Sequence, residues 1–219
     1  MEKKNKRLFF VGVGLLAAFM LWTLLVCFVD VRAIGPRESS VGFATLNGYV
    51  HNLTGVNMSL YVITDWLGLV PIGVAFGFAV LGLVQWIKRK CLLKVDRGIL
   101  ALGVFYIVVM VAYIFFEMVV INYRPVLIDG CLEASYPSST TMLVMCVMPT
   151  AAIQLNLRIK NTVIRQYAII TIAAFTLFIV IGRLISGVHW ITDIIGGALL
   201  SIAIVLMYYS IGNVVAKSC

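Results

Sequence analysis

The sequence has few charged residues and no segment with the composition of a soluble domain. Only 12% of its 219 residues are charged, whereas a soluble domain carries about 25%. So few charges cannot cover a water-soluble particle, because 62% of the residues are hydrophobic. Lipid must therefore surround most of the chain, and we interpret residues 1–219 as a single membrane domain.

Patterns of metal ligands and disulfides are also missing. The five cysteines are scattered and contain no CxxC pair. Only Cys131 lies in a segment that is clearly predicted to be outside the cytoplasm, so we do not expect an internal disulfide. No cluster of metal-binding residues is visible in the sequence. We therefore expect neither a metal ion nor a cofactor.

Six apolar stretches are long enough, or nearly long enough, to cross a membrane, which takes about 20 residues. The fourth stretch is the shortest and contains Pro149, and the second contains Pro71; packed helices tolerate such prolines. The stretches are residues 8–29, 60–87, 98–121, 141–157, 167–185 and 190–211. The sequence thus predicts an all-α fold with six transmembrane helices.

Membrane topology explains the net charge of +8 better than nucleic-acid binding does. Thirteen of the 17 Lys and Arg residues, the last of them Lys217, lie before the first stretch, in alternate connections, or after the sixth. Cytoplasmic segments are enriched in Lys and Arg, so this placement predicts that both termini are cytoplasmic. We expect a multi-pass protein of the plasma membrane that binds membrane lipids and no nucleic acid; the oligomeric state is not predicted.

The first outer connection, residues 30–59, is the longest. Its tail, residues 41–57, mixes apolar with small polar residues. Such a segment can lie along the membrane surface as a helix or form an irregular loop. The sequence does not decide between the two.

The last two stretches are joined by a segment with a reactive set of residues. His189 and Asp193 are four residues apart and therefore share one face of a helix. The carboxylate can accept the proton of one imidazole nitrogen, which leaves the other nitrogen free as a nucleophile. Arg183 adds a planar fork of donors that matches phosphate oxygens. A plain ion pair between Arg183 and Asp193 at the membrane boundary is the alternative interpretation.

A second outer connection contains Arg124 and the helix start Ser138-Ser139-Thr140. Hydroxyl residues at such a start cap free N–H groups, which by itself requires no ligand. The same position also attracts anions. Two arginines, a His–Asp pair and a helix N-terminus on one membrane face together predict a phosphate-binding site.

These residues resemble the motifs of the type 2 phosphatidic acid phosphatase family of membrane lipid phosphatases, and the likeness covers nearly the whole chain. The third motif of that family is Ser-Arg, five residues, His, three residues, Asp. Arg183, His189 and Asp193 match it, with Gly182 in place of the serine. This is the most specific of the matches.

The other two motifs are matched in part. The second motif, Pro-Ser-Gly-His, has Thr140 at the histidine position. The first motif is Lys, six residues, Arg-Pro, and here Arg124 is present while Glu117 stands at the lysine position. The resemblance therefore implies the family's fold with two changes in its site.

The resemblance also implies roles for the matching residues. His189 is expected to be a catalytic nucleophile that forms a phosphohistidine, and Asp193 is expected to orient it. The residues expected to bind the substrate phosphate are Arg124, Arg183, Ser138, Ser139 and Thr140. The implied partner is a phosphorylated lipid at the extracytoplasmic face of the membrane.

Thr140 has a consequence for the substrate, because it cannot protonate a leaving group at neutral pH. A lipid alcohol normally needs such help, which contributes about 10²–10⁴-fold to a rate. A phosphate leaving group needs it far less, because its second pKa is about 6. The sequence therefore favours a polyprenyl diphosphate, such as undecaprenyl diphosphate, over a phospholipid phosphate, unless His51, Asp129 or Glu133 supplies the proton.

A protein that binds or moves a phosphorylated lipid without cleaving it is the alternative function. The changes at Thr140 and Glu117 favour this alternative. The pair His189 and Asp193 favours the enzyme, because binding alone does not need a His–Asp pair. Phosphate release by the purified protein distinguishes the two.

Overall fold

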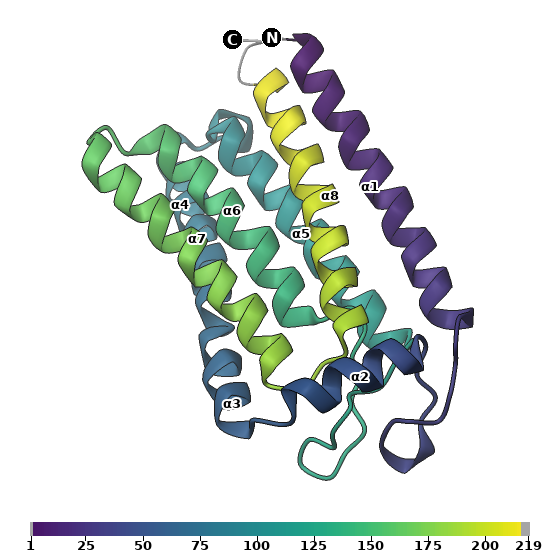
Figure 1. Cartoon of the computed structure of the whole chain (residues 1–219). Helices are drawn as coiled ribbons and strands as arrows, with labels where there is room; N and C mark the ends of the chain where they lie inside the picture. Colours follow the sequence, from purple (N-terminus) through teal and green to yellow (C-terminus); the bar gives the residue numbers. More distant parts are fainter. Residues whose placement is uncertain (1, 216–219) are drawn as a thin grey trace.

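The structure is a computed structural model, and it describes residues 2–215. Within this part of the chain, six helical segments are long and apolar enough to cross a membrane. This confirms the predicted all-α fold with six spans (Figure 1). The helices are α1 (Glu2–Phe28), α2 (Ala44–Thr54), α3 (Met58–Leu67), α4 (Leu69–Arg89), α5 (Arg97–Met118), α6 (Ser139–Arg158), α7 (Thr162–Ile185) and α8 (Ile191–Val215).

The second span consists of two helices, α3 and α4, because the helix is interrupted at Gly68. Pro71 accounts for the break: proline lacks the backbone N–H, and its ring clashes with the carbonyl four residues earlier. That carbonyl belongs to Leu67, the last residue of α3. Gly68 and Leu69 line a cavity of about 1000 Å³, so the break shapes one of its walls.

The centre of the bundle is formed by α6 and α8. Helix α8 packs along α1 and against α6, and α6 also packs against α7. The core between these helices includes Phe19 of α1, Met142 and Cys146 of α6, and Leu200 of α8. Small residues permit the close approach, because a Cβ at Gly12 of α1 would lie 2.8 Å from Met207 of α8.

Helix α2 lies across the ends of the membrane-spanning helices (Figure 1). Its buried Asn47 binds the start of α8: Nδ2 donates to the Thr192 hydroxyl over 3.0 Å, and Oδ1 accepts from the Thr192 backbone over 3.3 Å. Leu46 and Leu53 on α2 are exposed. Of the two possibilities that the sequence left open, the structure has the helix, and its exposed apolar side fits a membrane surface.

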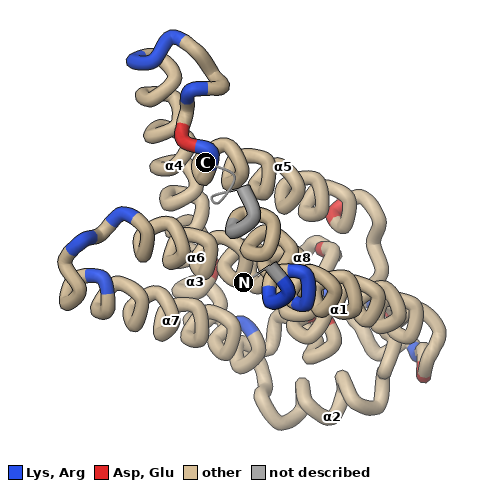
Figure 2. The backbone as a smooth tube through the Cα atoms, turned by 90° about the horizontal axis from the view of Figure 1, so that it is seen from above, with Lys and Arg blue, Asp and Glu red and all other residues tan. Residues whose placement is uncertain are grey.

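The two ends of the bundle differ in charge. Lys and Arg residues concentrate where α1 begins, between α4 and α5, and between α6 and α7 (Figure 2), at the same end as both termini (Figure 1). These are the basic residues that predict a cytoplasmic face, apart from Lys217, which lies outside the described residues. Helix α2 and the connections 119–138 and 186–190 lie at the opposite end, which we call the site end.

Candidate active site

His189 and Asp193 meet at the site end, at the start of α8. The direct distance from His189 Nδ1 to Asp193 Oδ2 is 3.7 Å, which is too long for a hydrogen bond. Ser135 bridges the two. Its hydroxyl oxygen lies 3.2 Å from His189 Nδ1 and donates its proton to Asp193 Oδ2.

This bridge assigns the tautomer of His189. A serine hydroxyl has a single proton, and Ser135 gives it to Asp193. The Ser135 oxygen can then only accept, so the imidazole proton belongs on Nδ1 of His189. Nε2 is left with its lone pair, and it lies 3.2 Å from Nη2 of Arg183, which donates to it. A histidine in this state is ready for attack through Nε2.

His189 is also kept neutral. Its side chain is buried, and desolvation together with the positive charges of Arg124 and Arg183 holds the pKa of His189 well below its ordinary value. The charged form is the one that these surroundings disfavour. Near neutral pH the imidazole is therefore uncharged, and its Nε2 carries no proton.

Both arginines lie near the ring of Tyr61 in α3. The guanidinium carbon of Arg183 is 5.0 Å from the centre of the Tyr61 ring, and that of Arg124 is 5.9 Å from it. Both are within the range of a cation–π contact. Nη1 of Arg124 and Nε of Arg183 are buried, and the described part of the chain offers neither a hydrogen-bond acceptor. Both arginines thus retain donors for a bound anion.

Each arginine also contacts one carboxylate. Nη1 of Arg183 lies 3.3 Å from Oδ1 of Asp65 in α3. Nε of Arg124 lies 3.0 Å from Oε2 of Glu133. Connection 119–138 holds Arg124 and Glu133 together, since it folds back on itself and the Arg124 N–H donates to the Glu133 carbonyl over 3.1 Å. The carboxylates orient the guanidinium groups without using all their donors.

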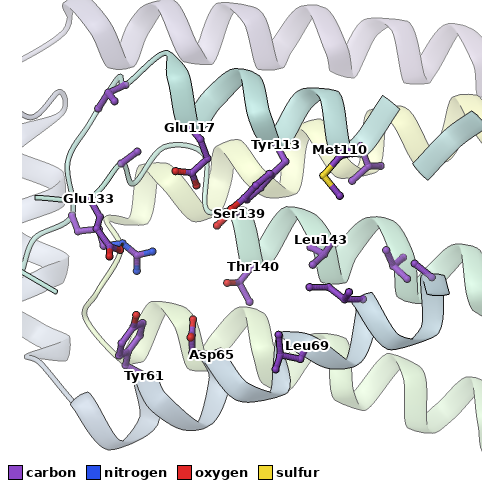
Figure 3. A pocket seen from close by; sticks show the side chains of 18 of the residues that line it. Tyr61, Asp65, Leu69, Met110, Tyr113, Glu117, Glu133, Ser139, Thr140 and Leu143 are labelled. Carbon is purple, nitrogen blue, oxygen red and sulfur yellow. Dashed lines mark ion pairs between the residues drawn. The ribbon is translucent and has the colours of Figure 1, made fainter. Parts of the chain in front are cut away.

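A cavity of about 1000 Å³ opens beside these residues. Its walls come from α3, α4, α5, the start of α6 and connection 119–138 (Figure 3). Tyr61 and Arg124 line its polar end, and the apolar side chains of Ile72 and Val147 line its other parts. Such a cavity fits a molecule with a phosphate at one end and a hydrocarbon chain at the other.

Ser138, Ser139 and Thr140, at the start of α6, have different surroundings. Ser139 and Thr140 line the cavity. Ser138 is buried, its hydroxyl accepts from the backbone of Thr141 over 3.4 Å, and its own N–H donates to the carbonyl of Asp193 over 3.1 Å. The hydroxyl of Ser138 is therefore a helix cap, and the cap is tied to the start of α8.

The alternative proton donors that the sequence offered lie in different places. Glu133 lines the cavity and is paired with Arg124. The ring of His51 lies 5.5 Å from that of Trp190, and neither His51 nor the exposed Asp129 is among the residues that line the cavity. In residues 2–215, no three His, Cys, Asp or Glu residues form a group that could hold a metal ion.

Sequence reasoning missed three residues of this site: Ser135, Tyr61 and Asp65. Asp65 could have been identified from the sequence, because a carboxylate inside a predicted span is rare and usually functional. Ser135 could not, since it lies in a polar connection among other hydroxyl residues. Tyr61 looked like an ordinary aromatic residue near the end of a span.

Comparison with known proteins agrees with this description. Residues 100–215 match the PAP2 superfamily. The fold is similar to that of a transmembrane PAP2-type phosphatidylglycerolphosphate phosphatase from Bacillus subtilis, with a TM-score of 0.56 and 19% sequence identity over 94% of this chain and 96% of the other. No sequence among the curated proteins matches this chain.

The family match covers all the residues that resemble its motifs, from Glu117 to Asp193. It extends over more than half of the 219 residues. The structural likeness, at its low identity, carries the fold alone. Family and fold together support a phosphatase that acts on a lipid in a membrane. The chain belongs to the PAP2 superfamily.

Proposed function

We propose that this protein hydrolyses a phosphorylated membrane lipid through a phosphohistidine at His189. One observation carries the proposal: a neutral imidazole has its proton held on Nδ1 by Ser135 and Asp193, and its Nε2 lies 3.2 Å from Arg183. His189 and Arg183 lie behind the wall of the lipid-sized cavity, next to its lining residues Tyr61 and Arg124. Binding alone requires the arginines and the cavity. The fixed tautomer is what a nucleophile requires.

The residues divide the work as follows. Arg124 and Arg183 bind the phosphate oxygens with the donors that lack a partner. When the phosphate accepts hydrogen bonds from the guanidinium of Arg183, the hydrogen bond from Arg183 to Nε2 of His189 is lost. Nε2 is then free to attack phosphorus. The free N–H groups at the start of α6, near Ser139, favour the negative charge that builds up on the phosphoryl group. Water then cleaves the phosphohistidine.

The substrate is a lipid whose phosphate lies at the membrane surface, either a phospholipid phosphate or a polyprenyl diphosphate. The cavity is polar beside Arg124 and apolar beside Leu143 and Val147, which are in the spanning part of α6. A hydrocarbon chain can occupy the apolar part while the phosphate stays at the site end. With the basic residues on the cytoplasmic side, the site faces the extracytoplasmic leaflet.

Release of inorganic phosphate from defined lipids by the purified protein tests this proposal. His189→Ala should reduce turnover by at least about 10³-fold, as loss of a nucleophile does in other enzymes, while the variant keeps its fold and its affinity for the lipid. The wild type should also show a phosphoryl group on His189 by mass spectrometry after rapid quenching. A wild type that binds the lipid and releases no phosphate would establish the binding protein instead.

A further inference from the structure

Three carboxyl groups line the main cavity, on Asp65, Glu117 and Glu133. Two of them are engaged by the phosphate-binding arginines: Asp65 with Arg183, and Glu133 with Arg124. Within residues 2–215, Glu117 has no such cation. In the described part of the chain, Glu117 is therefore the carboxyl group of this cavity that no arginine holds, and its oxygens can contact a bound substrate.

Glu117 also lines the same cavity as a phosphate-binding arginine. It is in the last turn of α5 and lines the main cavity together with Arg124 and Thr140. It also lines a small side cavity with Ser135 and Ser139, and Ser135 is the residue that contacts His189. Figure 3 shows the Glu117 carboxyl group pointing into the pocket on the side of Ser139, while Tyr61 and Asp65 lie on the opposite wall.

We propose that Glu117 is the general acid that protonates the leaving oxygen of the lipid. This inference rests on the proposed function. It links the two departures from the family's motifs, at Glu117 and Thr140, because both residues line one cavity. Thr140 has no acid to offer where the family has a histidine, and Glu117 provides a carboxylic acid to the same space.

The proton balance of the reaction is complete with this group. In the first step, the lone pair of His189 Nε2 forms the N–P bond while the P–O bond to the lipid breaks. The electron pair of that bond goes to the leaving oxygen, which takes the proton of Glu117. In the second step, water gives a proton to the Glu117 carboxylate and forms the new P–O bond. The N–P bond breaks, and its electron pair returns to Nε2.

The inference changes the expected substrate. The preference for lipid diphosphates follows from Thr140 only if no other group supplies the proton. With Glu117 as the acid, the lipid alcohol of a monophosphate leaves as a neutral molecule, so monophosphates are cleaved as well. Glu117 in its protonated form is uncharged and does not repel the substrate phosphate.

The test compares two substrates with the same hydrocarbon chain, a lipid monophosphate and the matching lipid diphosphate. Glu117→Gln keeps the size of the side chain and removes the acidic proton. We expect the rate of the first step with the monophosphate, measured as alcohol released in a single turnover, to fall by roughly 10²–10⁴-fold, the usual contribution of a general acid. The first step with the diphosphate should change little, because its leaving phosphate needs no proton. Hydrolysis of the phosphohistidine, in which Glu117 accepts the proton of water, is common to both substrates and should slow equally. A nitrophenyl phosphate should behave like the diphosphate.

Asp65→Asn and Glu133→Gln are the matched controls. Each removes a cavity carboxylate that contacts an arginine, so each should change both substrates in parallel through phosphate binding. A rescue variant adds a second, independent readout. Thr140→His in the Glu117→Gln background should restore monophosphate turnover, because it places an acid in the same cavity from another wall.

The outcomes separate this inference from the proposed function. Equal losses in the first-step rate with both substrates in Glu117→Gln, or no loss with either, overturn the role of Glu117 as general acid while the phosphatase stands. Wild-type protein that cleaves neither lipid overturns the phosphatase itself. Should Glu117→Gln fail to fold, Glu117→Asp replaces it, and its monophosphate rate must fall further than its diphosphate rate for the inference to survive.

Discussion

Ser135 is the residue on which the geometry of the nucleophile depends. Without its hydroxyl, His189 and Asp193 are left 3.7 Å apart with no hydrogen bond between them. Ser135→Ala should therefore lower kcat by roughly 10–100-fold, by analogy with the loss of a hydrogen-bond partner of a metal-binding histidine, and leave KM nearly unchanged. Asp193→Asn should cost more, about 10³–10⁴-fold, because an amide favours the wrong tautomer. Steady-state kinetics with one lipid measure both effects.

A purely structural role for Ser135 would give a different result. Ser135→Thr keeps the hydroxyl group and should retain most of the activity that Ser135→Ala loses. If alanine and threonine at this position reduce kcat equally, or if both act on KM, the bridge between His189 and Asp193 has no part in catalysis.

Site residues could be predicted from the sequence where the interacting residues are close together along the chain. The four-residue spacing of His189 and Asp193 predicted their proximity, but the shared helix face was wrong, because His189 precedes α8, which begins at Ile191. The bridge through Ser135 could not be predicted, because it depends on how connection 119–138 folds against the start of α8. Similarly, the pairing of Asp65 with Arg183 joins residues 118 positions apart, and no local pattern encodes such a contact.

At the scale of helices, the six spans could be predicted because hydropathy depends on composition alone. The predicted ends of the spans differ from the observed helix ends by a few residues. For example, the third span was expected to reach residue 121, whereas α5 ends at Met118. The break in the second span was not predicted, because Pro71 was expected to be tolerated within one helix, whereas the structure has two helices that meet at Gly68. Helix α2 remained undecided, because a short segment of mixed polarity folds as a helix only where neighbours such as Thr192 bind it.

Gly187, between α7 and α8, packs tightly against Gly55, between α2 and α3. It adopts a φ of +68°, which side chains rarely allow, and a Cβ there would lie 1.9 Å from the carbonyl oxygen of Gly55, between α2 and α3. Gly187→Ala should destabilise the protein by about 1–3 kcal/mol from backbone strain and lower turnover, since His189 is two residues away. Thermal unfolding in detergent and phosphate release measure the two effects.

Gly103→Ala is the matched control for this experiment. Gly103 is in α5, and a Cβ there meets no atom within 4 Å. Alanine at this position should leave both stability and turnover close to those of the wild type. Equal behaviour of the two variants would show that the approach of Gly187 to Gly55 does not constrain the site.

At the scale of the whole molecule, most basic residues and the candidate active site lie at opposite ends of the helix bundle. Most of the Lys and Arg residues lie at the end where α1 begins (Figure 2). Arg124 in connection 119–138, Arg183 in the last turn of α7 and His189 in connection 186–190 lie at the site end. The positive-inside rule predicts that the end with the termini is cytoplasmic. The site would then act on lipids of the opposite leaflet, so the orientation decides which pool of substrate the enzyme reaches.

Two native cysteines report this orientation. Cys131 is exposed in connection 119–138 at the site end, and Cys91 lies between α4 and α5 at the end with the termini. In variants that retain one of them, a membrane-impermeant maleimide should label Cys131 in intact cells and Cys91 only after permeabilisation. Because Cys91 is partly buried, Leu93→Cys, at a residue that is 85% exposed, serves as its control. Labelling of residue 91 or 93 from outside, with Cys131 protected, would place the active site in the cytoplasm and remove extracytoplasmic lipids as substrates.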